Sequence, residues 1–456
     1  MADENVFSAL ADRVTGPVLT PGQDGYDDEL KTFQTGYRHR PAVVVGAENA
    51  EDVRAAVEFA VKNGLPVGVQ GSGHGITVLD EDGVLISTRR LAGVTVDAEA
   101  GTARVGAGAL WKDVVAQTVP HGLAPLSGSA PHTGVAGYTL GGGIGLLGRE
   151  FGYAADLVRS LEVVTADATV SRVTGESDPD LFWALLGGRD NFGIVTELEF
   201  GLLPAARLYG GGIYYDADDA EAVFAFFREW TATAPESVTS SVGMIAYPPI
   251  DAFPEPLRGR HVVHVRFATT DLEGGPDLVR PWQDAAPVIL DHLGEIGYEE
   301  VGSIYREPDF AHSFFGNNVL LSELPVEALD AVRELAGKDA PVSCIVDLRH
   351  LGGAMSREPG TPNAVPFRRA QYILRVLSGL DGEDEKAVRA AHKRVYDAVA
   401  PWTVGRSLNF VYGRRTDDEF VDQVYDRATL ERLTELKGVY DPNNVFRRNQ
   451  NVRPRA

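Results

Sequence analysis

The sequence contains one cysteine, Cys344, and has few basic residues relative to its acidic ones. A single cysteine excludes an intramolecular disulfide framework. The chain carries 42 Lys and Arg against 65 Asp and Glu, which gives a formal net charge of -23. Because phosphate-backbone binding needs clustered positive side chains, this balance argues against nucleic acid as a partner. It favours a neutral or cationic small molecule as the ligand.

Long hydrophobic runs are also absent. No stretch of about 18 apolar residues is available to cross a bilayer, so we expect no membrane insertion. The first residues, MADENVFSAL, lack the basic start and apolar core of a secretion signal, which favours a cytoplasmic location. The ten histidines form no HExxH-type pairing with carboxylates, so we predict no metal site.

The length of 456 residues is too great for one hydrophobic core. We predict an α+β fold with an irregular N-terminal arm at 1–36 and a first domain at 37–206. A second domain at 207–406 reads as an antiparallel sheet backed by helices. The last segment, 407–456, returns to the first domain. Within it, SLNFVYG at 407–413 reads as a strand.

A strand-helix-strand unit precedes the most informative motif. PAVVVG (41–46) and PVGVQ (66–70) read as strands around a helix that Asn49 can cap. Such a unit delivers the next residues, GSGHG at 71–75, to the carboxyl edge of a sheet, where ligands usually bind. His74 is therefore placed at a site.

A second glycine cluster, LGGGIG, lies at 140–145. Gly143, Gly145 and Gly148 match G-x-G-x-x-G, but no hydrophobic strand precedes them, which argues against a nicotinamide-binding Rossmann domain. Two glycine loops can instead enclose a pyrophosphate with unobstructed backbone N–H groups. The alternative, that these glycines only serve tight turns, stays open at this point.

Five separated motifs carry a family resemblance. RPAVVVG, GSGH, SAPHTGVAGYTLGGGIG, NFGIVTELEF and YDPNNVFRRNQN occur in this order, and together they resemble the FAD-linked oxidases of the vanillyl-alcohol oxidase type, with their PCMH-type FAD-binding domain, in the berberine-bridge-enzyme-like branch. The resemblance implies that His74 is bonded to the 8α-methyl group of FAD. Many members have a second tether from a cysteine, but Ala130 stands at that position. One covalent link is therefore expected.

The resemblance also implies which residues surround the cofactor. They lie around its pyrophosphate, along its second face, near its adenosine half, by its flavin ring and in the tail of the chain. In chain order they are Gly71, Ser72, Gly73, His74, Gly75, Thr133, Gly134, Gly137, Gly142, Asn191, Gly193, Ile194, Val195, Asn409 and Asn449.

The implied reaction removes a hydride and a proton from a C–OH or C–N centre of a small molecule, with molecular oxygen as the electron acceptor. The family often uses strand tyrosines as the base, but Ser407 and Phe410 stand at those positions. The candidates for the base are Tyr412, Tyr153 and His350, each of which can equally be a packing residue. Amine oxidation is one alternative function, and a flavin- or ligand-binding protein without catalysis is another. We expect a monomer or a homodimer.

Overall fold

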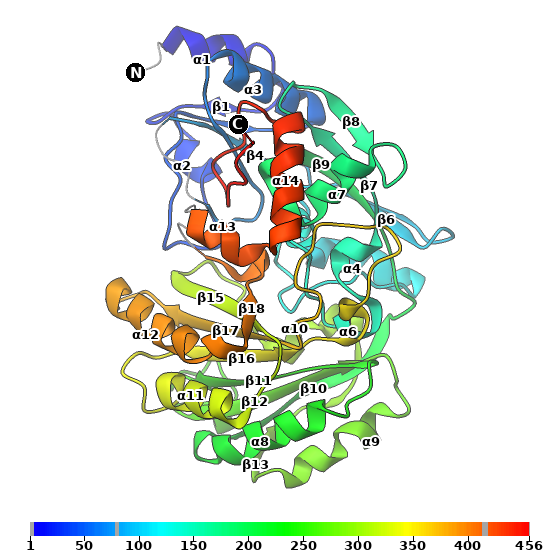
Figure 1. Cartoon of the computed structure of the whole chain (residues 1–456), viewed down its shortest axis with the longest axis vertical. Helices are drawn as coiled ribbons and strands as arrows, with labels where there is room; N and C mark the ends of the chain where they lie inside the picture. The colour runs from blue at the N-terminus through cyan, green and yellow to red at the C-terminus, as the bar shows by residue number, and fades with distance from the viewer. Residues whose placement is uncertain (1–3, 78–81, 413–417, 456) are drawn as a thin grey trace.

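The computed structural model describes residues 4–77, 82–412 and 418–455. They form a mixed α+β structure with three sheets, which confirms the predicted fold class. Two sheets lie with both ends of the chain in the upper half of Figure 1, and the third sheet lies below them. The boundaries that we predict at residues 36, 206 and 406 stay a prediction.

The first sheet has the order β1-β2-β4-β3. Its strands are β1 (Val18–Leu19), β2 (Val43–Gly46), β3 (Val67–Gln70) and β4 (Val84–Ser87). Strands β2, β4 and β3 are parallel, and β1 is antiparallel to β2. Helix α3 (Ala50–Lys62) joins β2 to β3, and the Asn49 side chain caps it by accepting a hydrogen bond from the N–H of Asp52. The predicted strand-helix-strand unit is thus confirmed, and GSGHG follows β3 directly.

The second sheet is antiparallel and has the order β5-β6-β9-β7-β8. Its strands are β5 (Val94–Asp97), β6 (Thr102–Gly106), β7 (Val158–Val164), β8 (Val170–Val173) and β9 (Ile194–Gly201). The helices of this region are α4 (Trp111–Thr118), α5 (Val135–Leu140), α6 (Gly148–Phe151) and α7 (Pro179–Gly188). Trp111, Phe182 and Phe192 are fully buried in the core between them.

The third sheet has nine strands, all paired antiparallel. They are β10 (Arg207–Asp216), β11 (Val238–Ala246), β12 (His261–Thr269), β13 (Val288–Asp291), β14 (Gly294–Gly297), β15 (Phe314–Leu321), β16 (Ile345–His350), β17 (Tyr372–Gly379) and β18 (Thr403–Gly405). Side chains alternate between the faces of a strand. One face therefore carries Val265, Leu348 and Leu374, which pack in one core with the helices at 220–231, 275–279, 326–336 and 385–398.

The opposite face of the third sheet is polar. The register of β11, β12, β16 and β17 brings a serine, an aspartate and three arginines together on it: Ser241, Arg266, Asp347, Arg349 and Arg375. All five are buried. This face is the part of the sheet that matters for the site.

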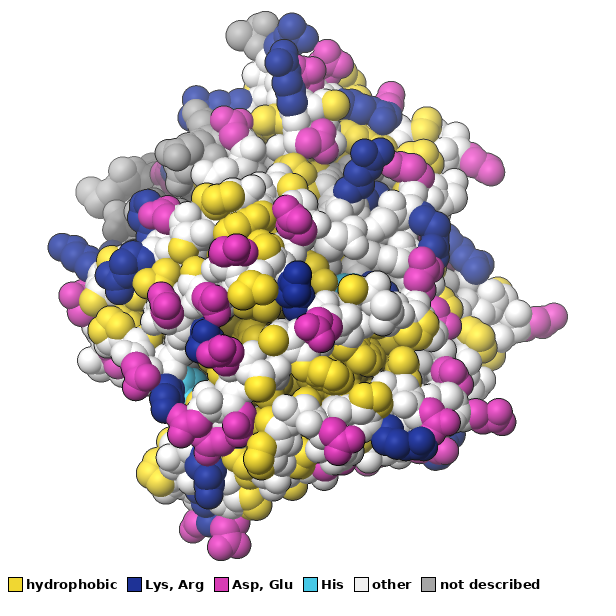
Figure 2. Space-filling model, turned by 60° about the horizontal axis from the view of Figure 1, so that its bottom comes forward, with side chains coloured by type: hydrophobic (Ala, Val, Ile, Leu, Met, Phe, Trp, Pro, Cys, Tyr) yellow, Lys and Arg dark blue, Asp and Glu magenta, His cyan; other side chains and the backbone are white. Residues whose placement is uncertain are grey.

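The remaining helices are α1 (Glu4–Ala11), α2 (Tyr26–Glu29), α8 (Ala220–Thr231), α9 (Gly275–Val279), α10 (Gly302–Tyr305), α11 (Val326–Ala336), α12 (Glu385–Ala398), α13 (Asp418–Val424) and α14 (Arg427–Tyr440). No helix in the described ranges is both long and apolar enough to cross a membrane. On the face shown in Figure 2, acidic side chains are scattered with lysines and arginines between them.

Two predictions about local structure are wrong. The N-terminal arm is not irregular, because it contains α1 and β1, and its Phe7 and Leu10 are buried in the core with α3. The segment at 407–412 is not a strand but contains a 3-10 turn at Leu408–Phe410. The Asn318 side chain donates to the carbonyl oxygens of Ser407 and Phe410, and of the backbone of this segment the N–H of Tyr412 bonds to β15, at the carbonyl oxygen of Gly316. Gly413 lies outside the described residues.

Candidate active site

A cavity lies between the GSGHG loop, the second glycine-rich segment and the polar face of the third sheet. Its empty space, counted together with the solvent at its mouth, is about 1440 Å³. Distant parts of the chain contribute to its lining, including His74, Tyr138, Arg349, Arg375, Asn409 and Gln450. A cavity of this kind, with few convergent polar groups, is where small molecules bind.

The GSGHG loop is held from outside by the N-terminal arm. The N–H groups of Phe33 and Gln34 donate to the carbonyl oxygens of Ser72 and Gly73, at 3.1 Å each. Gly73 has φ +71°, and a Cβ placed there would lie 2.5 Å from the Thr32 side chain. Only glycine fits this position. The arm thereby fixes the backbone of the loop.

Ser72 joins the two glycine-rich loops. Its Oγ lies 2.9 Å from Nδ1 of His74 and accepts a hydrogen bond of 3.2 Å from the N–H of Gly134. The Phe33 ring stacks on the His74 ring with centroids 4.0 Å apart and planes 7° from parallel. The imidazole is therefore fixed in both position and orientation.

The other ring nitrogen of His74, Nε2, is buried and has no hydrogen-bond partner in the described part of the chain. Burial, with smaller contributions from His132 and His312, lowers the pKa of His74 to about 3. The ring is therefore neutral at pH 7, and one nitrogen carries a lone pair. A neutral, oriented imidazole is suited to act as a nucleophile.

The second glycine-rich segment lines the cavity with Thr133, Gly134 and Gly137. Asn409 also lines it and donates a hydrogen bond of 2.8 Å to the carbonyl oxygen of Tyr138. Gly142 is not among the lining residues. It adopts φ +105° in a turn against Val365, so its glycine serves the backbone conformation.

The predicted adenosine-side residues divide into two groups. Gly193 and Val195 line the cavity, whereas Asn191, Ile194 and Asn449 do not. Ile194 is buried in the core beside α3. Asn449 is buried, and its amide nitrogen lies 3.4 Å from the carbonyl oxygen of Phe446.

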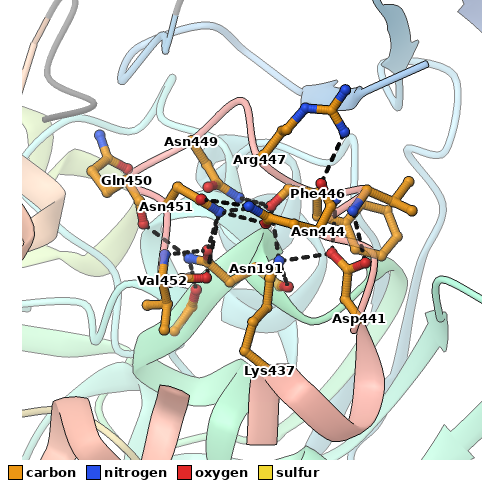
Figure 3. A network of polar contacts seen from close by, with 12 residues as sticks. Asn191, Lys437, Asp441, Asn444, Phe446, Arg447, Asn449, Gln450, Asn451 and Val452 are labelled. Carbon is orange, nitrogen blue, oxygen red and sulfur yellow. Dashed lines mark hydrogen bonds and ion pairs between the residues drawn. The ribbon is translucent and has the colours of Figure 1, made fainter. Parts of the chain in front are cut away.

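Asn191 belongs to a polar network that fastens the C-terminal tail (Figure 3). Its Oδ1 accepts a hydrogen bond of 2.9 Å from the N–H of Val452, and its amide nitrogen donates to the carbonyl oxygen of Gln450 at 3.1 Å. Lys437 donates to the carbonyl oxygen of Asn191 at 2.6 Å and pairs with Asp441 at 2.7 Å. Asn191 therefore positions cavity residue Gln450 through its backbone.

Of the three candidate bases, Tyr412 lines the cavity. It is half-buried, and the Arg375 guanidinium group lies near enough to lower the pKa of its hydroxyl against the larger, raising effect of burial. Tyr153 is buried under the guanidinium group of Arg368, 5.0 Å from the ring centroid. His350 is buried with Nε2 2.9 Å from an Arg149 nitrogen. Neither Tyr153 nor His350 lines the cavity, so neither is positioned to take a proton from a molecule bound there.

Several cavity residues were missed by sequence reasoning. Arg349 and Arg375 line the side formed by the third sheet, Glu307 lines the cavity from the loop between α10 and β15, and Arg448 lines it from the C-terminal tail. The alternation of charged and apolar residues in IVDLRH, at 345–350, was an available signal for the first of these. It places Asp347 and Arg349 on one strand face, opposite a buried apolar face.

The lining fits a flavin dinucleotide. A Cβ built on Gly71 or Gly75 would meet nothing closer than 3.6 Å and 3.9 Å, so the backbone of the loop is open to a ligand on those sides. The unpartnered Nε2 of His74 is a buried polar atom within the same lining. No group of three or more His, Cys, Asp or Glu within the described ranges could hold a metal ion.

Comparisons with known proteins agree with this geometry. The family described as FAD binding domain matches residues 41–174, and the family described as berberine and berberine like matches residues 395–453. An FAD-linked oxidoreductase of Dictyostelium discoideum is 24% identical, covering 98% of this chain and 97% of that protein.

Two further relatives match over almost their whole length. The (R)-6-hydroxynicotine oxidase of Paenarthrobacter nicotinovorans is 26% identical over 97% of each chain. The structure of a xylooligosaccharide oxidase from Myceliophthora thermophila C1 superposes with a TM-score of 0.85, at 21% identity and 99% coverage of both chains. The chain is thus an FAD-dependent oxidoreductase with an FAD binding domain and a berberine-like C-terminal segment, and its homologues are FAD-linked oxidoreductases of the vanillyl-alcohol oxidase (PCMH-type) and berberine-bridge-enzyme-like superfamily.

Proposed function

We propose that this enzyme is an oxidase that converts a C–OH centre of a small organic molecule to a carbonyl group. The substrate loses a hydride and a proton, and molecular oxygen takes up both to give hydrogen peroxide. One observation carries the proposal: a neutral, fixed His74 and a half-buried Tyr412 line the same cavity. The oxidase names of two relatives support it.

We further propose that FAD is bound covalently through His74. Bound FAD supplies the two-electron acceptor for the hydride. The backbone of Gly71, Gly73 and Gly75 and the Thr133 and Gly134 segment would hold its pyrophosphate. The new C–N bond replaces one C–H of the 8-methyl group and the N–H of the imidazole, so two electrons and two protons leave, and oxygen accepts them.

Tyr412 is our candidate for the group that takes the hydroxyl proton of the substrate. Burial raises the pKa of Tyr412, while the neighbouring Arg375 acts in the opposite direction. The guanidinium group lowers the cost of the phenolate form of Tyr412, which is the form that can accept the substrate proton. Asn409, fixed by its bond to Tyr138, would orient the flavin ring or the substrate beside it.

Amine oxidation is the second candidate within enzymes, because one relative bears the name of a nicotine oxidase. A flavin-binding protein without catalysis is the alternative from another class. A substrate screen with peroxide detection separates them. Peroxide from alcohols supports alcohol oxidation, peroxide from amines supports amine oxidation, and no peroxide from either supports a binding protein without catalysis. A cytoplasmic location and a monomeric or homodimeric state remain proposals from the sequence.

The covalent link is tested by mass analysis of the acid-precipitated protein. We expect the peptide that contains His74 to carry one FAD. In His74→Ala the denatured chain should release its flavin entirely, because no other tether is proposed. The native variant should still retain some FAD through the glycine loops.

His132→Ala is the matched control, since His132 lies in the same aromatic cluster with ring centroids 5.0 Å from His74. It should keep the covalent flavin. Flavin that stays attached to the denatured His74→Ala chain would overturn the assignment.

A further inference from the structure

Three arginines surround one aspartate on the polar face of the third sheet. The carboxylate of Asp347 lies 2.8 Å from a nitrogen of Arg349, 2.8 Å from one of Arg375 and 3.3 Å from one of Arg266. All four side chains are buried, with 5–6% exposed. Buried guanidinium groups are costly unless they are paired, so their charge balance matters.

Positive charge is in excess in this cluster. Burial tends to raise the pKa of Asp347, but the three arginines lower it to about 2, so the carboxylate is ionised. Among the residues that the structure describes, one further carboxylate pairs with these arginines, that of Glu307, which lies 3.7 Å from Arg349 and is about one-third exposed. Three positive charges therefore face two negative ones.

The excess charge is directed at the cavity. Arg349 and Arg375 line it, whereas Arg266 and Asp347 do not. Nε of Arg375 is buried and has no hydrogen-bond partner among the described residues. A guanidinium group offers five N–H donors, and its planar edge matches a carboxylate. Arg375 thus retains a donor for a ligand.

Aromatic rings hold the two arginines in place. The guanidinium carbon of Arg375 lies 4.0 Å from the centroid of the Phe410 ring, and that of Arg349 lies 4.4 Å from the centroid of the Tyr305 ring. Stacking fixes the plane of each guanidinium group without using its edge donors. The site is therefore preorganised for an anion.

We propose that the substrate carries an anionic oxygen group, such as a carboxylate, which Arg349 and Arg375 bind inside the cavity. This inference rests on the proposed function and narrows it to acidic small molecules, such as hydroxy acids. It replaces the neutral or cationic ligand that the net charge of -23 favours. Arg375 and Tyr412 line the same cavity, so the anion is held in the chamber of the proposed base.

The test measures binding to the oxidised holoenzyme by calorimetry and by the visible absorption of its flavin. The probes are benzoate, its neutral isostere benzamide, and phenyl phosphate. We expect benzoate to bind at least about tenfold more tightly than benzamide, because a charged hydrogen-bonded pair contributes that much. Tighter binding of phenyl phosphate than of benzoate would assign a phosphate as the natural anion.

Variants identify the residues responsible. Arg375→Gln and Arg349→Gln should each abolish the preference for benzoate, and Arg375→Lys should restore part of it. Arg266→Gln is the matched control, because it removes the same charge next to Asp347 from a residue outside the cavity lining. It should keep most of the preference.

Three results would overturn the inference: equal binding of benzoate and benzamide, no benzoate binding at millimolar concentration, or an equal loss in all three glutamine variants. A preference that survives in Arg375→Gln and Arg349→Gln while the flavin potential falls would assign the arginines to the cofactor. Peroxide production is measured separately. Selective anion binding without peroxide from any acid would overturn the oxidase function instead.

Discussion

At the scale of single residues, the Tyr412 hydroxyl can be tested without changing the shape of the cavity. In Tyr412→Phe we expect kcat to fall by about 10²-fold, because a positioned proton acceptor is lost. The aromatic ring still packs on Phe314, 4.9 Å away, so flavin content should not change. The rate of flavin reduction, measured by stopped flow across pH, reports the effect.

Tyr153→Phe is the control for this experiment, since Tyr153 is buried outside the cavity lining. Its rate should stay within about twofold of the parent enzyme, on the scale of ordinary remote substitutions. A normal rate and pH profile in Tyr412→Phe would rule out Tyr412 as the base.

Gly73 makes a prediction about the loop. In Gly73→Ala the new Cβ would lie 2.5 Å from Thr32, at a backbone φ of +71° that alanine disfavours. We expect the loop to shift and flavin incorporation to fall several-fold, measured as the ratio of visible to protein absorbance. Gly93→Ala is the control, because its Cβ would meet nothing within 4 Å and Gly93 lies outside the cavity lining, so it should incorporate flavin as the parent does.

The sequence identified the glycine loops and His74 because those motifs depend on local backbone requirements. It did not identify Arg349 and Arg375 as cavity residues, because their common position depends on the pairing of β16 with β17. The position of Asn191 near the cofactor stays a prediction; in the structure it bonds the tail and does not line the cavity. The sequence alone does not show whether the amide side chain of an asparagine binds a ligand or the protein backbone.

At the scale of elements, the tail depends on the buried ion pair between Lys437 on α14 and Asp441. Both side chains are fully buried, and Lys437 also donates to the carbonyl oxygens of Asn191 and Phe446. In Lys437→Met the carboxylate of Asp441 is left without its cation, which costs about 3–5 kcal/mol. We expect flavin to be released at a lower temperature, followed by its fluorescence.

Arg427→Met is the control on the same helix, because Arg427 pairs with Glu431 on the exposed surface. Exposed pairs contribute about 0–1 kcal/mol, so its release temperature should hardly change. Equal release temperatures in both variants would contradict the role of the buried pair.

Helices and strands with strong periodicity were predicted well, as α3 with its Asn49 cap illustrates. The segment at 407–412 was not, although its residues favour a strand. Its conformation is set by Asn318, which lies about 90 residues earlier in the sequence and bonds its backbone. Tertiary contacts of this kind override local propensity.

At the scale of the whole molecule, buried histidines make stability depend on pH. Burial lowers the pKa of His39 and His392 to about 4, and burial with Arg149 lowers that of His350 to about 3. Their pKa in the unfolded chain is about 6.5. Below that pH the unfolded chain binds more protons than the folded protein. The contribution of these histidines to the free energy of unfolding is therefore fully present above pH 6.5 and falls as the pH drops toward 4.

Each group should contribute a slope of about 1.4 kcal/mol per pH unit in this window. Thermal unfolding midpoints recorded between pH 4 and 8 report the trend. His350→Gln keeps an acceptor for Arg149 but cannot be protonated, so its midpoint should fall less steeply with acid. An unchanged slope would show that His350 is already protonated in the folded protein.

The arm and the tail have a consequence for biosynthesis. Phe33 covers one side of His74, and Gln450 lines the same cavity and donates to Thr77 beside the loop. Residue 450 leaves the ribosome more than 400 residues after residue 33. The chamber therefore cannot close around the prosthetic group until residue 450 has been made, and loading of that group is a late step of maturation.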